Sequence, residues 1–208
     1  MNCFITGTDT GVGKTHCTAL LLRTLTKSGM TAAGYKPVCS GGREDAAALL
    51  AASSAPLELD EVNPFWFRVP LSPLVAALIE NRPVPWEALL TGYHALAKRF
   101  DRVLVEGAGG WETPLSQGKT MADFAAALQL PVIVVAANRL GALNHTILTV
   151  RSVQARGLRC AGIILNHVEE ERDAASISNR AVLEELLQVA VLAEVMHNET
   201  ELALEQAL

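Results

Sequence analysis

The residues best suited to chemistry lie near the start of the chain, in the stretch T-G-T-D-T-G-V-G-K-T that ends at Thr15. A short apolar run precedes it, and leucines with helical spacing follow it. In such a loop, backbone N–H groups and the start of a helix attract phosphate oxygens. Lys14 can reach terminal phosphates, the Thr15 hydroxyl can bind Mg²⁺, and Gly11 and Gly13 allow close backbone approach. The stretch predicts a nucleoside triphosphate site; the alternative is a glycine-rich turn before an ordinary helix.

The spacing of this loop departs from the common phosphate-loop pattern G-x-x-x-x-G-K-[ST]. Counted back from Gly13, that pattern needs a glycine at position 8, where this chain has Thr8. The glycine is Gly7, one residue earlier. A loop lengthened by one residue points to a particular kind of phosphate-loop protein.

Charged residues also follow other apolar runs. Lys36 precedes Pro37 at the end of T-A-A-G-Y-K-P-V, and Glu106 follows R-V-L-V. A carboxylate directly after a buried strand costs free energy unless it has a partner or a use. Phosphoryl transfer depends on screening anions from one another, and Lys14 and Lys36 are a suitable pair for this. Lys36 can instead be read as a solvated surface lysine.

Apolar runs alternate with helical patterns along the chain, and this alternation indicates the strands and helices that position these residues. We expect strands at residues 3–6, 31–37, 102–107, 131–138, 160–168 and 189–195, and helices at 14–28, 72–80, 86–99, 121–128, 142–156 and 173–187. Uninterrupted apolar strands suit a parallel sheet that is covered on both faces. The order predicts a doubly wound α/β fold of the phosphate-loop NTPase type, with a mostly parallel sheet and helices on both faces.

Ligands of such sheets lie at the carboxyl ends of the strands. The rule gathers residues 7–15, 36–40, 106–110, 138–144 and Asn166 at one shared site. With 208 residues, the chain is expected to form a single domain over 1–208. Residues 53–70, rich in proline and acids, are expected to be a surface connection, and residues 196–208 a short amphipathic helix.

Composition excludes several classes of function. The chain has no run of about 18 apolar residues and no signal-peptide pattern, so we expect a cytoplasmic protein without a membrane partner. The net charge of −5 argues against general binding of nucleic acid. Its four cysteines are widely spaced and predict reduced thiols rather than a zinc site. The histidines show no triad partner and are expected to be structural or exposed.

The lengthened loop, of the form Gly-x₅-Gly-Lys-Thr, resembles that of the dethiobiotin synthetases. Further blocks are similar to that family in the same order, between residues 4 and 168: A-G-Y-K-P-V-C-S-G, V-N-P-F-W-F, S-P-L-V-A-A, R-V-L-V-E-G-A-G-G-W-E-T-P-L, L-P-V-I-V-V-A-A-N-R-L-G-A-L-N-H and G-I-I-L-N-H-V. The resemblance implies closure of a ureido ring. One amine of 7,8-diaminononanoate takes up CO₂ to give a carbamate, ATP phosphorylates it, and the second amine displaces phosphate to yield dethiobiotin.

The resemblance also implies residue roles, with ATP and Mg²⁺ as cofactors. The catalytic residues would be Lys36, Lys14 and Thr10, and the metal would be held by Thr15, Asp45 and Glu106. The nucleotide would contact Gly11, Val12, Gly13, Lys14, Thr15, His16, Glu106, Gly107, Ala108, Gly109 and Asn166. The substrate would contact Thr10, Lys36, Ser40, Gly109, Gly141, Ala142, Leu143 and Asn144. Residues 141–144 would serve the partner subunit of a homodimer, completing its site across the interface.

Simpler readings stay open for several of these residues. Thr10, Ser40 and Asn166 can be turn residues, and residues 141–144 can be a plain helix start. Asp45 can be a helix N-cap, and Glu44 beside it is an alternative third acidic group.

Two positions depart from the family pattern and leave the nucleotide preference open. Gly11 stands where some members have Glu, and L-A-E-V-M-H-N-E-T lacks the usual Gly-x-[IL]-Pro after the last strand. Two other functions are also weighed: a phosphate-loop ATPase of the partition or amide-synthetase type, and a nucleotide-binding regulatory module without turnover. The partition type generally carries a lysine within the loop, and this loop has Asp9 and Thr10 before Gly11.

Overall fold

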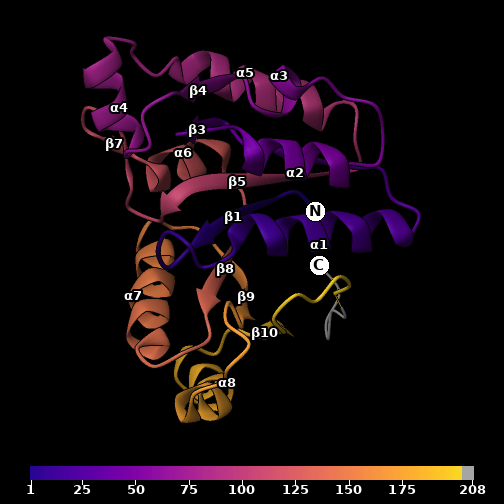
Figure 1. The fold of residues 1–208 in the computed structure, drawn as a ribbon, viewed down its shortest axis with the longest axis vertical. Coiled ribbons are helices and arrows are strands. Elements are labelled where there is room, and N and C mark those ends of the chain that lie inside the picture. Colours follow the sequence, from indigo (N-terminus) through magenta and orange to yellow (C-terminus); the bar gives the residue numbers. More distant parts are fainter. Residues whose placement is uncertain (203–208) are drawn as a thin grey trace.

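The computed structural model describes residues 1–202, and its core is a parallel sheet (Figure 1). The six strands have the order β10-β9-β8-β1-β5-β2. Their bounds are Cys3–Gly7 for β1, Ala32–Tyr35 for β2, Arg102–Gly110 for β5, Val132–Ala137 for β8, Cys160–Asn166 for β9 and Val191–Val195 for β10. Every neighbouring pair is parallel. Strand order reverses on either side of β1, which places the loop after β1 at the switch point of the sheet.

Helices cover both faces of this sheet, as the doubly wound fold requires. One face packs against α5 (Trp86–Ala97), α6 (Met121–Leu128), α7 (Ala142–Ala155) and α8 (Ala174–Leu187). The other packs against α1 (Lys14–Lys27), α2 (Glu44–Ala52) and α3 (Leu59–Val62). Within β1, Phe4 belongs to the first core, and Cys3 and Ile5 belong to the second. This alternation is what a strand buried on both faces produces. The predicted fold class is confirmed.

The chain between β2 and α2 corrects one expectation. Residues 31–37 were expected to form one strand of the sheet, but β2 ends at Tyr35. The Lys36 N–H instead donates to the Val62 carbonyl (2.8 Å), and Pro37 has no N–H to offer a ladder. A new strand, β3 (Val38–Ser40), then pairs with β4 (Phe65–Phe67) in a separate small sheet. The break turns Lys36 out of the main sheet.

Residues 53–70 are also not the surface connection that their composition predicts. They contain α3 and β4, and Val62, Asn63 and Phe67 are fully buried. Elements of three or four residues are too short to show a periodic pattern. The segment is part of the core beside Lys36.

Other differences are smaller. Strand β5 runs on to Gly110, beyond its expected end at residue 107, and a hairpin of β6 (Pro114–Ser116) and β7 (Lys119–Thr120) follows. Helix α4 (Pro73–Glu80) lies with α5 at one end of the molecule, and α8 at the other (Figure 1). Residues 196–202 form no helix, and the rest of the helix expected there, 203–208, lies outside the described residues. The predicted free cysteines are confirmed. Across residues 1–202, no helix is long and apolar enough to cross a membrane.

A single buried amide joins the Lys36 segment to its surroundings. The Asn63 side chain donates to the carbonyls of Lys36 (2.7 Å) and Phe65 (2.9 Å), and it accepts from Arg43 Nε (3.0 Å). Arg43 is the N-cap residue of α2. Asn63 therefore fixes the end of β2, the start of β4 and the start of α2 relative to one another.

We predict that Asn63→Ala lowers the free energy of unfolding by about 1–3 kcal/mol, because buried carbonyls lose their donors. Urea unfolding followed by circular dichroism measures the change. The control is Gln117→Ala, which removes an exposed amide in the β6–β7 turn and should stay within about 0.5 kcal/mol of wild type. Equal losses in the two variants would contradict the role of Asn63.

Candidate active site

The loop after β1 holds its lysine folded back over it. Lys14 is 7% exposed, and its Nζ donates to the Asp9 carbonyl at 3.2 Å. A Cβ on Gly7 would lie 3.0 Å from that Nζ and 2.8 Å from the same carbonyl. The glycine at position 7, the feature that made the loop spacing unusual, thus leaves room for the returning lysine. The loop is closed around the point where a phosphate oxygen would bind.

The other end of the loop rests on β9. Gly13 has a φ of 86° and precedes the first residue of α1. A Cβ at Gly13 would lie 2.1 Å from Asn166 Nδ2, which donates to the Val12 carbonyl at 2.9 Å. Only glycine satisfies both the backbone angle and this contact. One of the two N–H donors of Asn166 is therefore used to hold the loop, and the rest of the amide stays available for a ligand.

A buried ion cluster lies beside the loop. Lys36 Nζ donates to Glu106 Oε1 at 2.6 Å, to Asp45 Oδ2 at 3.0 Å and to the Gly107 carbonyl at 3.3 Å. The Thr15 hydroxyl donates to the same Glu106 oxygen at 2.7 Å. The side chains of Lys36 and Glu106 are 4% and 0% exposed. Lys36 from the segment after β2 thus meets residues of β5, α1 and α2 at one point at the carboxyl edge of the sheet.

The charges in this cluster set the protonation of its members. Burial lowers the pKa of Lys36, but the carboxylates of Glu106 and Asp45 outweigh it and hold this pKa above its usual value. Partial burial raises the pKa of Asp45, and the Lys36 ammonium more than reverses that, so the net pKa is lowered. For Lys14, burial and the positive charge of Lys36 lower the pKa to about 8. Among the described residues, no carboxylate lies within bonding distance of Lys14, so this cation gains from a bound anion.

The donor set fits a hard cation. Glu106 Oε2 is buried and has no hydrogen-bond partner among the described residues, although the other oxygen accepts two bonds. A buried carboxylate oxygen without a partner is costly unless a ligand satisfies it. The Thr15 hydroxyl and Asp45 supply further oxygens close by, and Mg²⁺ prefers a few protein oxygens with water completing the shell. Residues 1–202 hold no group of three His, Cys, Asp or Glu side chains that could bind a metal ion by itself. An ion bound mainly by water and phosphate would not need such a group.

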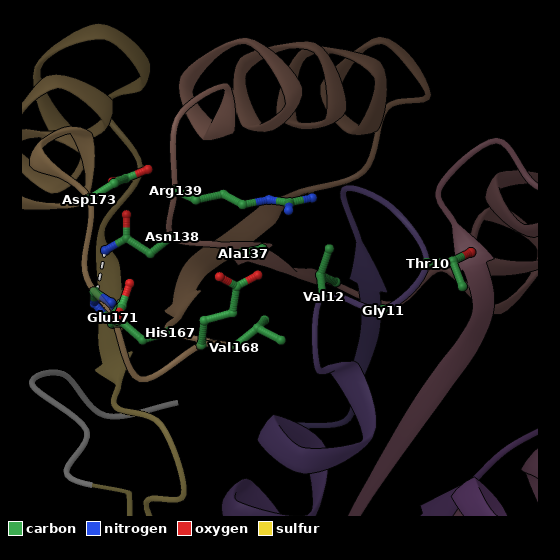
Figure 2. A pocket seen from close by; sticks show the side chains of 11 residues that line it. Thr10, Gly11, Val12, Ala137, Asn138, Arg139, His167, Val168, Glu171 and Asp173 are labelled. Atoms are coloured by element: carbon green, nitrogen blue, oxygen red, sulfur yellow. Dashed lines mark hydrogen bonds between the residues drawn. The ribbon is translucent and has the colours of Figure 1, made fainter.

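Three cavities meet at Thr10. One of about 260 Å³ is lined by the phosphate loop, Lys36, Asp45 and Gly109. A second, of about 510 Å³, lies between Thr8–Thr10, the chain after β5, and α7. A third, of about 360 Å³, lies between Gly11–Val12 and the segment from His167 to Asp173 (Figure 2). The small cavity of the loop thus adjoins two larger cavities at Thr10.

Figure 2 shows the third cavity from close by, with the Arg139 side chain extending toward the side of the cavity on which Val12 lies. Its wall includes His167, which is 4% exposed and lies 3.1 Å from Asn138 Nδ2. His167 is therefore structural, as expected, whereas His16 at the start of α1 is exposed.

The structure brings most of the predicted site residues together and leaves some apart. The small cavity and its immediate contacts include Thr10, Gly11, Val12, Gly13, Lys14, Thr15, Lys36, Asp45, Glu106, Gly107, Gly109 and Asn166. Glu44 does not line this cavity, and Asp45 is not an N-cap, because α2 begins at Glu44. Ser40 Oγ is buried and has no partner among the described residues. Residues Gly141, Ala142, Leu143 and Asn144 open α7 and line none of these three cavities.

Sequence reasoning missed several cavity-lining residues. Trp111 and Glu112 lie in the block R-V-L-V-E-G-A-G-G-W-E-T-P-L but were given no role, and Leu148 and Ser152 lie one turn apart on α7. The helical spacing of the last two was a usable signal, since residues four apart share a face. Nothing in the sequence showed that this face is turned toward the phosphate loop.

A parallel sheet with a phosphate loop at its switch point, and a lysine–carboxylate cluster beside that loop, defines a phosphate-loop nucleotide-binding protein. A family model described as "AAA domain" matches residues 1–202. The chain is 43% identical over 198 residues to the ATP-dependent dethiobiotin synthetase BioD of Akkermansia muciniphila, covering 95% of this chain and 93% of that protein. It is 47% identical over 173 residues to the protein of the same name from Serratia marcescens, covering 79% and 76%. The chain belongs to the dethiobiotin synthetase family.

Solved structures share the architecture at lower identity. The septum site-determining protein MinD from Pyrococcus horikoshii, complexed with Mg-ADP, has a TM-score of 0.57 and 17% identity, covering 95% of this chain and 82% of that one. Chloroplast FtsY from Physcomitrella patens has a TM-score of 0.56 and 17% identity. This chain is covered to 98% in that match and spans only 61% of the FtsY chain. Identities this low show the fold alone.

We predict that Gly13→Ala lowers the affinity for ADP at least tenfold, since the added methyl group displaces Asn166 and distorts the loop. Gly118→Ala is the matched control, because Gly118 also has a positive φ (70°) and its Cβ would meet nothing within 4 Å. Both variants carry a similar backbone strain of about 1 kcal/mol. Isothermal titration with ADP separates the two effects, and equal affinities would show that Gly13 serves the backbone alone.

Proposed function

We propose that this chain catalyses the ATP-dependent formation of dethiobiotin from 7,8-diaminononanoate and CO₂. Membership of the family supports this, and one structural observation carries it. Two buried lysines, Lys14 and Lys36, line one small cavity, and Glu106, which pairs with Lys36, has an oxygen that no described residue satisfies. Such a site suits the meeting of a triphosphate with a second anion, because cations must screen both.

The reaction sets a role for each part of the site. An amine of the diamine adds to CO₂ to give a carbamate and a proton. A carbamate oxygen attacks the γ-phosphorus of ATP, the bond to ADP breaks, and a carbamic–phosphoric anhydride forms. The second amine then attacks the carbonyl carbon and phosphate leaves with the loss of a proton. Every step needs two groups held close together, so positioning supplies much of the rate.

In this proposal the phosphate loop holds the triphosphate. The N–H groups of residues 11–15 face the phosphate oxygens, and Lys14 gives up its contact with the Asp9 carbonyl to bind them. Asn166, already placed against Val12, directs its free amide groups to the nucleoside. The low pKa of Lys14 in the free protein follows from its burial and from Lys36, and a bound phosphate favours its charged form.

Lys36 is placed to serve the carbamate and the transferred phosphoryl group. Its ammonium stays charged because Glu106 and Asp45 surround it. Thr10, at the junction of the cavities, and Ser40, with its unpartnered buried hydroxyl, are suited to bind the amine and its carbamate. The cavity between the phosphate loop and α7 then receives the diamine.

The metal proposed for this site is Mg²⁺, with the Thr15 hydroxyl, Glu106 and Asp45 as its protein oxygens. Bound there, the ion would neutralise phosphate oxygens. Glu106 and Thr15 are already in contact, so the arrangement needs little rearrangement of side chains.

A homodimer is part of the proposal. Residues 141–144 stand at the start of a helix, a suitable place for a carboxylate, but they line none of the three cavities of their own chain described above. Leu140 is 81% exposed and Leu148, beside the diamine cavity, is 59% exposed. A second subunit that covers these leucines would bring a helix start to the far end of the substrate. The cytoplasmic location expected from the sequence stays a prediction.

The alternatives have less support. The likeness to MinD is one of fold, and the loop has Asp9 and Thr10 where a partition ATPase generally carries a lysine. A module without turnover would not need Lys36 and Glu106, and these two side chains meet at the candidate site.

The deciding experiment measures phosphate release with ATP, Mg²⁺ and bicarbonate, with and without 7,8-diaminononanoate. Release that depends on the diamine, together with a product of the mass of dethiobiotin, is the expected result. Phosphate release at the same rate with and without the diamine would favour a partition-type ATPase. Nucleotide binding without turnover would favour the regulatory module.

We predict that Lys36→Ala lowers kcat about 10²–10³-fold, because a group that acts mainly in the transition state is lost. ADP binding should stay measurable, since the phosphate loop is unchanged. The control is Lys98→Ala, which removes an exposed lysine after α5. Normal turnover in Lys36→Ala would remove this role for Lys36.

We also predict that Glu106→Gln raises the Mg²⁺ concentration needed for half-maximal activity about tenfold or more, because a neutral amide is a weaker ligand for a hard cation. Titration of Mg²⁺ at saturating ATP measures it, with Glu87→Gln on the exposed face of α5 as control. An unchanged titration would place the metal on other residues.

A further inference from the structure

The chain after β5 is bound to α7 by side chains for which the proposed reaction gives no role. Glu112 Oε1 accepts from the Ser152 hydroxyl at 2.8 Å, and the Trp111 indole N–H donates to the same hydroxyl at 3.1 Å. Glu112 Oε2 accepts from Arg156 Nη2 at 3.1 Å and from the Thr120 hydroxyl at 3.2 Å. Glu112 thus joins α7, the start of α6 and the segment that contains it.

This network is more than a surface ion pair. The side chains of Glu112 and Arg156 are 49% and 32% exposed, and a single pair of that kind contributes little to stability. Here, however, the pair continues into a buried part of the protein, because Trp111 is 3% exposed and packs edge-on against Phe4 of β1. Arg156 also contacts Asp123 in α6. Each end of the network is fixed to a different element.

The two elements that the network joins are the two walls of the diamine cavity. Trp111, Glu112 and Thr113 line it from one side, and Leu148 and Ser152 line it from α7. The phosphate-loop residues at its base, Thr8–Thr10, come from a third element. The width of this cavity therefore depends on how residues 110–113 and α7 are held together, and Ser152–Glu112 is a direct bond between those walls.

We propose that Glu112 is a positioning residue that sets the binding geometry of the diamine without touching the reacting atoms. The proposal rests on the proposed function, since it assigns the 510 Å³ cavity to the substrate. The proposed nucleotide contacts, the phosphate loop and Asn166, do not depend on this bond. Loss of Glu112 should therefore affect the diamine and spare ATP.

Steady-state kinetics of the full chain test this assignment. Glu112→Ala is expected to raise KM for 7,8-diaminononanoate about tenfold or more, because a wall displaced by even about 1 Å misplaces the substrate. KM for ATP should stay within about twofold of the wild-type value. The midpoint of thermal unfolding should stay close to that of the exposed control Glu87→Ala. A role in folding alone would not separate the two KM values.

Conservative and double variants sharpen the test. Glu112→Gln keeps an oxygen that accepts from Ser152 and should hold KM for the diamine within about threefold of wild type. Ser152→Ala breaks the same bond from the other wall and leaves the Glu112–Arg156 pair in place. If the two residues act through one contact, the effects of Glu112→Ala and Ser152→Ala on KM will not add in the double variant.

The possible outcomes are distinct. Diamine-dependent turnover in the wild type with an unchanged KM for the diamine in Glu112→Ala would overturn the role of Glu112 alone. An equal rise of KM for ATP, or full additivity in the double variant, would also overturn it. Absence of diamine-dependent turnover in the wild type would overturn the proposed function and this inference together. If Glu112→Ala fails to fold, Ser152→Ala and Glu112→Gln carry the same comparison.

Discussion

The buried ion pair between Lys36 and Glu106 is the constraint on which the candidate site depends. Removing two such charges from water costs several kcal/mol for each ion, and close geometry with further hydrogen bonds must offset it. The structure meets that condition with a contact of 2.6 Å and with Asp45, Thr15 and the Gly107 carbonyl around the pair. Replacing a buried ion pair by hydrophobic residues of similar volume is often neutral or stabilising. The cluster is therefore better explained by the chemistry of anions than by stability.

Several parts of the fold hold that pair in place. Strand β5 ends beside β1 and brings Glu106 next to the phosphate loop, and the early end of β2 releases Lys36 toward it. The small sheet of β3 and β4, with Asn63 behind it, keeps the backbone of Lys36 in position. Thr10 lines all three cavities and so connects the small cavity beside the charged centre with the two larger ones, one of which is the cavity proposed for the diamine. The site is a product of the switch point at β1 together with one irregular connection.

The sequence predicted the regular part of this arrangement well. Uninterrupted apolar runs identified the strands of the main sheet, and the rule about carboxyl ends placed Glu106 and Asn166 near the loop. The sequence could not show that β2 ends at Tyr35, because that end depends on a hydrogen bond from the Lys36 N–H to the carbonyl of Val62, a residue distant in the sequence. The prediction that residues 53–70 form a surface connection was wrong. Their burial results from tertiary packing, which leaves no periodic pattern in the sequence. Glu112 was passed over since its partners, Ser152 and Arg156, lie on a helix far along the sequence.

The separation of Lys36 and Glu106 along the chain has a consequence for the order in which the molecule assembles. They are 70 positions apart, and Lys36 leaves the ribosome first. A lone ammonium cannot enter the interior, so Lys36 stays in water until β5 has joined the sheet between β1 and β2. Contacts of such long range close a large loop, and closing that loop costs chain entropy. The charged centre thus requires β5 to be in place between β1 and β2.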